Sequence, residues 1–308
     1  MIEKADFEEF VRLAMAEPGH QNMRPVIEKE LLHADILFAL EKERLLDGLT
    51  FQGGTSLRLC QGSNRFSEDL DFAGDRDFAS RDVARIKQCI EDYVSKRYQL
   101  EVSVKEPSEL RSDPNYAEIK VDKWQVSVVT SPARKDIPKQ RIKLEIANVP
   151  AYTHEPHRLN VNYAFLPDGY RDLLIITESL DEVMADKLVS LANTKNYVRH
   201  RDIWDLQWLK QQGASPDMTL VQKKLADYSV EHYLDKARAM QARLPEIIGG
   251  SAFKNEMARF LPAVVLDRTI HQPKFSDYLC RENQGLLGQV IDALEGPKPS
   301  APSFEFTL

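Results

Sequence analysis

The sequence predicts an α+β fold, with helices and a mixed or antiparallel sheet in the first part of the chain and an all-helical second domain. Two observations predict it. Up to Thr177, short apolar or alternating segments are separated by clusters of Pro, Gly, Asp and Asn, which is typical of strands. After Thr177, apolar residues instead recur three and four positions apart, as amphipathic helices require.

The elements follow from these patterns in chain order. Apolar spacing predicts opening helices at residues 7–15 and 26–46. Segments typical of strands are residues 50–52, 69–73, 99–104, 117–130, 141–148 and 173–177, with one helix at 81–97 between them. In the second domain, helical spacing covers residues 178–193, 201–212, 220–243, 253–261 and 274–294.

Length and composition set the class of protein. The chain has 308 residues, with 41 Lys and Arg against 48 Asp and Glu, so its formal net charge is −7. At about 150 residues per domain, this length predicts two domains. We place them at 1–176 and 177–295, and expect the Pro- and Ser-rich residues 296–308 to form a mobile tail. Collagen-like, disordered and membrane classes are excluded.

The sequence also predicts the compartment. No uncharged apolar stretch approaches the roughly 20 residues of a bilayer span. The start of the chain is acidic and amphipathic, whereas a secretory signal is basic and then apolar. Three widely spaced cysteines, Cys60, Cys89 and Cys280, suit reduced thiols. We therefore expect a cytoplasmic protein that has no membrane partner.

A Gly-Gly pair follows the first predicted strand. Gly53 and Gly54 permit close approach of a ligand to the backbone, and a short helix is expected to begin near Thr55 or Ser56. The free N–H groups at the start of a helix attract phosphate. This segment therefore predicts a phosphate site, and the alternative is a tight connection that binds no ligand.

Two acids lie two residues apart in the next predicted strand. Asp69 and Asp71 share one face, while Leu70 and Phe72 point into the core. At about 4 Å and an effective dielectric near 20, two such carboxylates repel by roughly 4 kcal/mol. Mg²⁺, which prefers oxygen ligands, would relieve that repulsion. The alternative is a solvated edge strand with two exposed acids.

Glu145 is the third candidate acid. In the predicted strand around it, Ile142, Leu144 and Ile146 face the core and Glu145 faces the other side. Three acids that hold two metal ions are the arrangement of phosphoryl and nucleotidyl transfer. A cross-strand ion pair for Glu145 is the alternative.

These residues resemble a known family. Residues 53–57 (GGTSL) and 65–72 (RFSEDLDF) resemble the first motif of the nucleotidyltransferase superfamily, which is similar to DNA polymerase β, and in particular the AbiEii/AbiGii-type toxins. The resemblance implies a nucleotidyltransferase-like mixed sheet with flanking helices. It also implies that the turn at Gly53, Gly54, Thr55 and Ser56 holds the phosphates of an NTP and that Asp69 and Asp71 hold metal.

The family's second motif is a Lys-Leu pair followed by Arg-Asp-x-x-Asp-Leu, which here corresponds to residues 187–188 and 201–206. Ser179 and Glu182 have the spacing of a capping box for the helix that carries Lys187. Lys187 lies within the apolar stripe of that helix, where a cation is costly unless it faces a polar cleft. We expect it to meet the triphosphate. The alternative is that its side chain extends past the stripe to water.

Asp202 is expected near the start of the next helix, on the inward face, where it would orient or deprotonate the acceptor hydroxyl. The alternative is a helix cap or a partner for Arg199 or Arg201. Asp205 is expected to pair with Arg201 within the helix, because the two are four apart. A further basic residue of the family motif corresponds to Lys195 or Arg199.

The resulting expectation is a Mg²⁺-dependent transfer of NMP from an NTP, and the resemblance implies that the acceptor is RNA, at the 3′ end of tRNA. The resemblance implies the toxin of an abortive-infection toxin–antitoxin pair, with an antitoxin as partner. A basic run could steer such an acceptor: Arg134, Lys135, Lys139, Arg141 and Lys143. The alternatives are a small-molecule or protein acceptor, and a nucleotide-binding module that does not catalyse.

Two further patterns have simpler interpretations. His154 and His157 flank a Glu-Pro pair in a polar context, which predicts a surface loop rather than a metal site. Trp204 and Trp208, four apart, are expected to pack between helices rather than to stack on bases.

Overall fold

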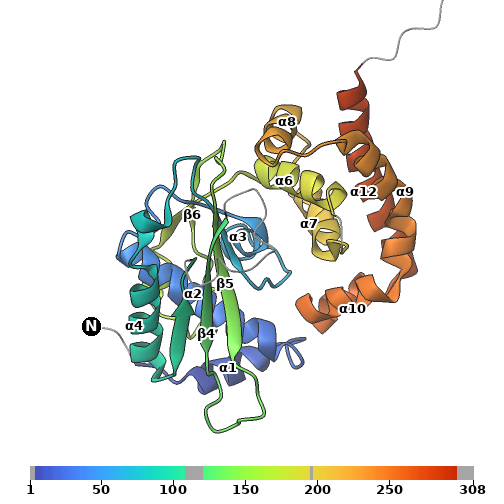
Figure 1. Ribbon diagram of the computed structural model, residues 1–308. Coiled ribbons are helices and arrows are strands. Elements are labelled where there is room, and N and C mark those ends of the chain that lie inside the picture. Colours follow the sequence, from blue (N-terminus) through green and yellow to red (C-terminus); the bar gives the residue numbers. More distant parts are fainter. Residues whose placement is uncertain (1–3, 108–120, 195–196, 297–308) are drawn as a thin grey trace, which may run out of the picture.

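The computed structural model describes residues 4–107, 121–194 and 197–296. Within these residues the fold is a seven-stranded mixed sheet with flanking helices, followed by a helical half (Figure 1). The strand order is β3-β4-β5-β2-β1-β7-β6. The strands are β1 Thr50–Gln52, β2 Leu70–Ala73, β3 Val102–Lys105, β4 Val121–Val128, β5 Gln140–Ala147, β6 Glu155–Arg158 and β7 Leu174–Thr177.

β2 lies in the interior of the sheet. It runs antiparallel to β1 on one side and parallel to β5 on the other, and the parallel register pairs Asp71 with Glu145. The predicted α+β class is therefore confirmed. The expected strand at 117–130 is observed as β4, although residues 117–120 lie outside the described part of the chain.

The prediction for the His154–His157 segment was wrong in one respect. Residues 155–158 form β6, a short edge strand antiparallel to β7, and not a loop. Pro156 is tolerated there because an edge strand leaves one side of its backbone unpaired. The segment is exposed, as expected, and His157 Nε2 lies 3.2 Å from Glu155 Oε2.

Helices cover one face of the sheet. They are α1 Phe7–Met15, α2 Arg24–Lys42 and α4 Ile86–Tyr98, with 3₁₀ turns at Ser80–Val83 and Asp168–Tyr170. In β5, Ile142, Leu144 and Ile146 are buried on the side where α2 packs. Because strand side chains alternate, the other face of β5 carries Glu145 toward the helical half.

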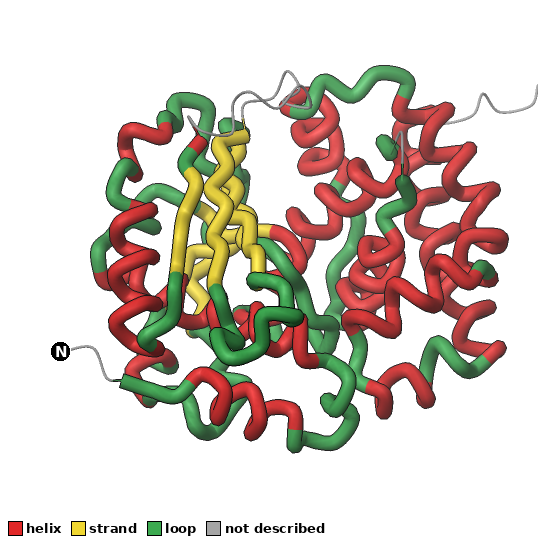
Figure 2. The backbone as a smooth tube through the Cα atoms, turned by 60° about the horizontal axis from the view of Figure 1, so that its bottom comes forward, coloured by secondary structure: helices red, strands yellow, loops and turns green. Residues whose placement is uncertain are grey.

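The second half is built from α6 Leu180–Ala192, α7 His200–Gln211, α8 Met218–Asp227, α9 Tyr233–Gly249, α10 Ser251–Phe260, α11 Ala263–Arg268 and α12 Pro273–Glu295. Figure 2 shows these helices gathered on the opposite side of the molecule from the strands. The expected single helix at 220–243 is wrong, because it breaks into α8 and α9. Ser229 and His232 interrupt it with left-handed φ values of 49° and 54°.

The core consists of two buried apolar clusters. One is formed by the sheet and its helices, and the other by the helical half. Leu57 of α3 (Gly53–Leu59) belongs to the helical cluster, and Phe260 of α10 belongs to the sheet cluster. Trp204 and Trp208 are buried in the helical cluster, as expected. In the described part of the chain, no helix combines the length and apolar character needed to cross a bilayer.

Candidate active site

A cavity of about 680 Å³ lies between the sheet and the helical half. The sheet side contributes the Gly-Gly turn and the acids Asp69, Asp71 and Glu145. The helical side contributes one face of α6 and the start of α7, including Lys187 and Asp202. The structure thus brings together the predicted residues from both motifs, although they lie more than a hundred positions apart in the chain.

The Gly-Gly turn is shaped by its neighbours. Gly53 has a φ of +77°, and a Cβ atom there would lie 2.8 Å from Asp71 Oδ2. A Cβ atom on Gly54 would collide with the guanidinium of Arg65. Only glycine fits at either position, because the acid and the arginine fill the space next to the turn. α3 begins at Gly53, slightly before the predicted start near Thr55 or Ser56.

Thr55 and Ser56 differ from the prediction. Both side chains are buried and do not line the cavity. The Thr55 hydroxyl donates to the Asp69 carbonyl, and Ser56 Oγ donates to the Gly53 carbonyl at 3.0 Å. The hydroxyls therefore hold the turn and the strand start in place, on the side away from the cavity lining.

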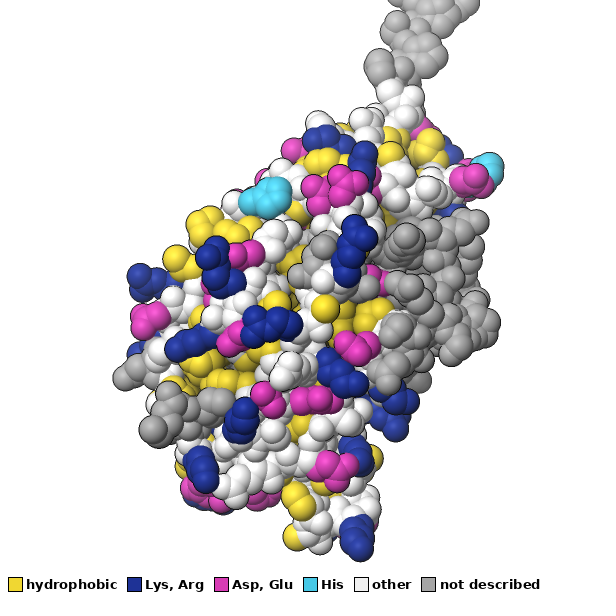
Figure 3. Space-filling view, turned by 60° about the vertical axis from the view of Figure 1, so that its left-hand side comes forward, with side chains coloured by type: hydrophobic (Ala, Val, Ile, Leu, Met, Phe, Trp, Pro, Cys, Tyr) yellow, Lys and Arg dark blue, Asp and Glu magenta, His cyan; other side chains and the backbone are white. Residues whose placement is uncertain are grey.

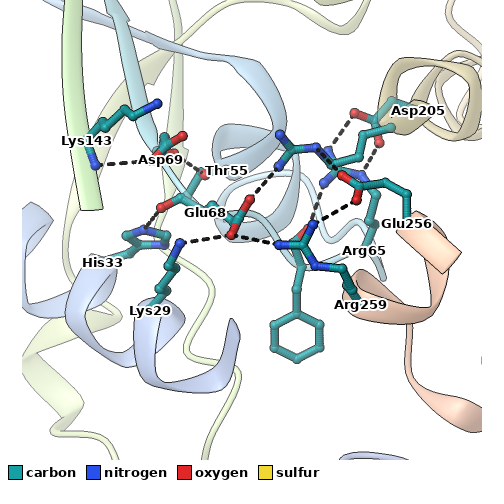
Figure 4. Close-up of polar contacts among 12 residues, drawn as sticks. Lys29, His33, Thr55, Arg65, Glu68, Asp69, Lys143, Asp205, Glu256 and Arg259 are labelled. Atoms are coloured by element: carbon teal, nitrogen blue, oxygen red, sulfur yellow. Dashed lines mark hydrogen bonds and ion pairs between the residues drawn. The ribbon is translucent and has the colours of Figure 1, made fainter. Parts of the chain in front are cut away.

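The acids lie in the middle of the sheet, so the alternative of a solvated edge strand is wrong. Asp69, just before β2, accepts a hydrogen bond from the Lys143 backbone N–H at 3.1 Å (Figure 4). Asp71 and Glu145 are neighbours on parallel strands. Glu145 also forms the cross-strand ion pair considered as its alternative, with Lys123 Nζ at 2.9 Å.

Like charge dominates this part of the cavity. Burial, followed by the charges of Glu145 and Asp69, raises the pKa of Asp71 to about 7, and Lys187 and Arg201 only partly oppose this shift. A bound cation would offset that repulsion, and hard carboxylate oxygens suit Mg²⁺. The donor set therefore fits a divalent ion. As it stands, however, no three acidic, His or Cys side chains of the described residues surround a common point.

Lys187 faces the cavity from α6 and is only 7% exposed, so the alternative in which it reaches water is wrong. Its Nζ lies 3.0 Å from Asp202 Oδ1 and 2.7 Å from Asp205 Oδ2. Although burial acts in the opposite direction, these two acids raise its pKa above the usual value. Lys187 is therefore a fixed cation in the cavity wall.

Asp202 and Asp205 have different partners from those predicted. Asp202 accepts hydrogen bonds from Lys187 Nζ at 3.0 Å and from Ser190 Oγ at 2.8 Å. The N-cap position of α7 is Arg199, so Asp202 is not the cap of that helix. Asp205 is not an intrahelical partner of Arg201. It is buried and receives two bonds from Arg65, at 2.6 and 2.7 Å.

Arg65 is the residue that sequence reasoning missed. It lies in the RFSEDLDF segment, whose acids attracted attention, and its guanidinium lines the cavity behind Gly54. Arg65 and Lys187 together lower the pKa of Asp205 to about 2 despite its burial. Of the two candidates for the additional basic residue, Arg199 lines the cavity, and Lys195 lies outside the described residues.

Glu68, next to Asp69, connects elements that are distant in sequence. Its carboxylate lies 2.9 Å from Lys29 of α2, 3.4 Å from Arg201 of α7 and 3.6 Å from Arg259 of α10 (Figure 4). The Glu68 carbonyl bonds to His33 Nε2 at 3.0 Å. The segment that carries Asp69 and Asp71 is thus held where the sheet half meets the helical half.

A glycine turn beside strand-borne acids, in a mixed sheet that faces a lysine from an appended helical half, defines a nucleotidyltransferase. The sequence matches, over residues 35–281, the family described as nucleotidyl transferase AbiEii toxins of type IV toxin–antitoxin systems. The chain belongs to this family. The match extends well past Leu220 into the helical half.

One solved structure supports this fold, and a second is similar to the chain at a lower score. MenT4, a nucleotidyltransferase toxin from Mycobacterium tuberculosis H37Rv, is 15% identical with a TM-score of 0.51, and the match covers 94% of this chain and 100% of that one. A putative nucleotidyltransferase from H. pylori is 18% identical over 88% of this chain and 96% of its own, with a TM-score of 0.46. No curated protein matches the sequence.

Proposed function

We propose that this nucleotidyltransferase transfers NMP from an NTP to an RNA acceptor and uses Mg²⁺. The observation that carries the proposal is the register of β2 and β5, which sets Asp71 beside Glu145 in a cavity that Lys187 also lines. Paired carboxylates opposite a fixed ammonium suit a metal-bound triphosphate.

In this proposal Asp69, Asp71 and Glu145 hold the metal. When bound, Mg²⁺ supplies positive charge to the attacking and leaving oxygens. The acids already repel one another in the protein alone, as the raised pKa of Asp71 indicates. Metal binding would therefore both complete the site and stabilise the fold around it.

The nucleotide contacts come from Gly53, Gly54 and Lys187. The backbone of the Gly-Gly turn admits the phosphates because it has no side chains, and the ammonium neutralises part of their charge. The acceptor hydroxyl oxygen forms a bond to the α-phosphorus, the bond to the bridging oxygen breaks, and pyrophosphate leaves. Asp202 orients the hydroxyl or takes its proton.

An RNA acceptor is supported by the sheet face next to the acids. Arg141 and Lys143 are exposed on the same face of β5 as Glu145. The rest of the basic run is less available, because Arg134 pairs with Asp136 at 2.7 Å and Lys139 with Glu101 at 2.7 Å. The biological role we propose is a cytoplasmic abortive-infection toxin that is controlled by an antitoxin.

The test is incubation of the protein with each labelled NTP, Mg²⁺ and total RNA. Asp71→Asn and Lys187→Met should lose label transfer by at least about a hundredfold, because the first removes a proposed metal ligand and the second removes the cation that meets the phosphates. Asp77→Asn, which changes an exposed acid near β2, should retain it. Unchanged labelling in Asp71→Asn would remove the proposed metal role.

A small-molecule or protein acceptor is the second candidate. Charge reversal at Arg141 and Lys143 distinguishes this candidate from an RNA acceptor. Label transfer to RNA should fall severalfold, whereas transfer to a small-molecule acceptor should be unchanged. A non-catalytic module is a third possibility. It predicts that growth inhibition on expression survives the loss of both Asp69 and Asp71.

A further inference from the structure

A second cavity, of about 510 Å³, lies on the outer side of α2 and α4 and shares no lining residue with the transferase cavity. Its walls come from the last turns of α2, one side of α4 and residues 167–170. Figure 3 looks onto the α4 side of the molecule, where hydrophobic side chains are exposed between Lys and Arg side chains. Nothing in the transferase chemistry uses this cavity.

Aromatic rings form part of its wall. The Phe38 ring lies 4.5 Å from Tyr170 and 5.6 Å from Tyr93, between ring centroids. The Tyr93 and Tyr170 hydroxyls are hydrogen-bonded at 3.0 Å, which fixes the two rings relative to each other. Fixed rings offer faces and edges to a planar ligand at little entropic cost.

A buried cation forms the base. Arg97 lines the cavity, is only 2% exposed, and has its Nε 3.1 Å from Asp35. Asp35 in turn accepts hydrogen bonds from the hydroxyls of Tyr98, at 2.6 Å, and Tyr170. The guanidinium is thus held rigidly next to the aromatic wall, and Asp35 balances its charge.

The mouth is basic. Arg85 pairs with Glu43 at 2.5 Å, and Lys96 pairs with Asp92 at 3.1 Å. Lys42 lies over the Phe38 ring at 4.7 Å and has no acidic partner within the described residues. With Arg97, four cations line the cavity, and they meet three acids: Glu43, Asp92 and Asp35, the buried partner of Arg97. The excess is one positive charge, that of Lys42, in a protein whose net charge is −7. The local excess of positive charge is therefore built into this site.

We infer that this cavity binds a planar aromatic anion of about the size of a nucleoside monophosphate. The rings of Phe38 and Tyr93 would contact the planar part, and the positive charge at the mouth would contact the anionic group. The volume lies within the roughly 300–1,000 Å³ of small-molecule pockets. The inference is independent of the proposed acceptor and metal.

Equilibrium dialysis of the full chain tests it, with labelled adenosine 5′-monophosphate as the probe. Adenosine, which lacks the charge, and inorganic phosphate, which lacks the ring, should each compete at least tenfold more weakly. Lys42→Glu should weaken probe binding at least tenfold. Lys87→Glu, the same charge change on α4 outside the cavity lining, should leave it within twofold.

A second variant tests the location without changing charge. Gln88 lines the cavity and is exposed, so Gln88→Trp should fill the mouth and weaken binding without unfolding the protein. Binding that is unaffected by both Lys42→Glu and Gln88→Trp would overturn the inference. Binding lost in a Lys187→Met protein whose circular dichroism and thermal unfolding show that it is still folded would also overturn it, because the probe would then occupy the transferase cavity.

Discussion

Gly53 shows how much a single residue can determine in this site. Its φ of +77° disfavours any side chain, and a Cβ atom would press on the Asp71 carboxylate. Gly48 has nearly the same φ, +78°, but nothing lies within 4 Å of its added Cβ atom. A comparison of substitutions at the two glycines therefore distinguishes the cost of backbone strain, which both share, from the cost of contact with Asp71, which only Gly53 has.

We predict that Gly53→Ala and Gly48→Ala each lose about 1–2 kcal/mol from left-handed strain, and that Gly53→Ala loses more. Only Gly53→Ala should lower transfer activity, because it displaces Asp71. Urea unfolding and label transfer measure the two effects. Equal losses in both variants would mean that the contact with Asp71 is irrelevant.

His33 gives the protein a predictable pH dependence. It is 1% exposed, and burial lowers its pKa from 6.5 to about 4, so it is neutral in the folded state. Between pH 6.5 and about 4, His33 binds a proton in the unfolded chain but stays neutral in the folded chain. The stability contributed by this group is therefore complete above pH 6.5 and is lost as the pH falls toward 4.

By pH 5 the loss should reach about 2 kcal/mol. His33→Gln retains a donor for the Glu68 carbonyl and should flatten the fall in stability between pH 6.5 and 4. His271→Gln, at an exposed position, should leave the fall unchanged. Thermal unfolding at several pH values distinguishes these outcomes, and parallel curves for all three proteins would argue against the role of His33.

Among the elements, α6 carries the most consequential side chains. Ser179 caps it by accepting from the Glu182 backbone N–H, as the capping-box spacing predicts. The Glu182 side chain does not complete the box. It accepts from the Tyr152 and Thr153 backbones and lies 2.7 Å from Lys224 of α8. The helix is thus fixed to the sheet half and to α8.

Lys224 is fully buried, and its Nζ also lies 2.8 Å from Glu178 and 3.0 Å from Asp186. Lys224→Met should cost about 3–5 kcal/mol, because it leaves buried acids without their cation. The exposed neighbour Lys223 supplies the control, since Lys223→Met loses only the contact of its ammonium with the Tyr152 ring and should stay within about 1 kcal/mol. Denaturant unfolding measures both, and similar values would show that the buried cluster contributes little.

At the scale of the whole molecule, buried polar and apolar contacts join the two halves around the active site. Arg65 of the sheet half and Asp205 of the helical half form a buried two-bond ion pair, and Asp205 also contacts Lys187. Phe260 of α10 enters the core of the sheet half, and the Phe66 N–H donates to its carbonyl at 2.9 Å. Cavity shape and the pairing of the halves are therefore linked.

Asp205→Asn should destabilise the protein by about 3 kcal/mol, since two buried cations lose their charged partner. Transfer activity should fall with it, because Lys187 and the arginine behind Gly54 both shift. Replacing the pair by Arg65→Met with Asp205→Leu should recover part of the stability but not the activity. Full recovery of transfer in that double variant would contradict a positioning role for the pair.

The sequence by itself determined the α+β class, most strand positions, the inward-facing Lys187 and the sharing of one face by the acids. These depend on local periodicity and on motif spacing, which the chain displays directly. Two features without a local sequence signal were not predicted. One is the interruption of the helix at Ser229, and the other is the edge strand β6.

Only the tertiary structure decided the partners. Asp205 pairs with Arg65, 140 residues away, and not with Arg201 four residues away. Lys224 gathers three acids that the sequence leaves unconnected, and the cavity beside α4 unites three separate segments. A buried charge pairs with whichever opposite charge the packing of the elements brings close to it. Local periodicity in the sequence carries no information about that packing, so it cannot predict the partner.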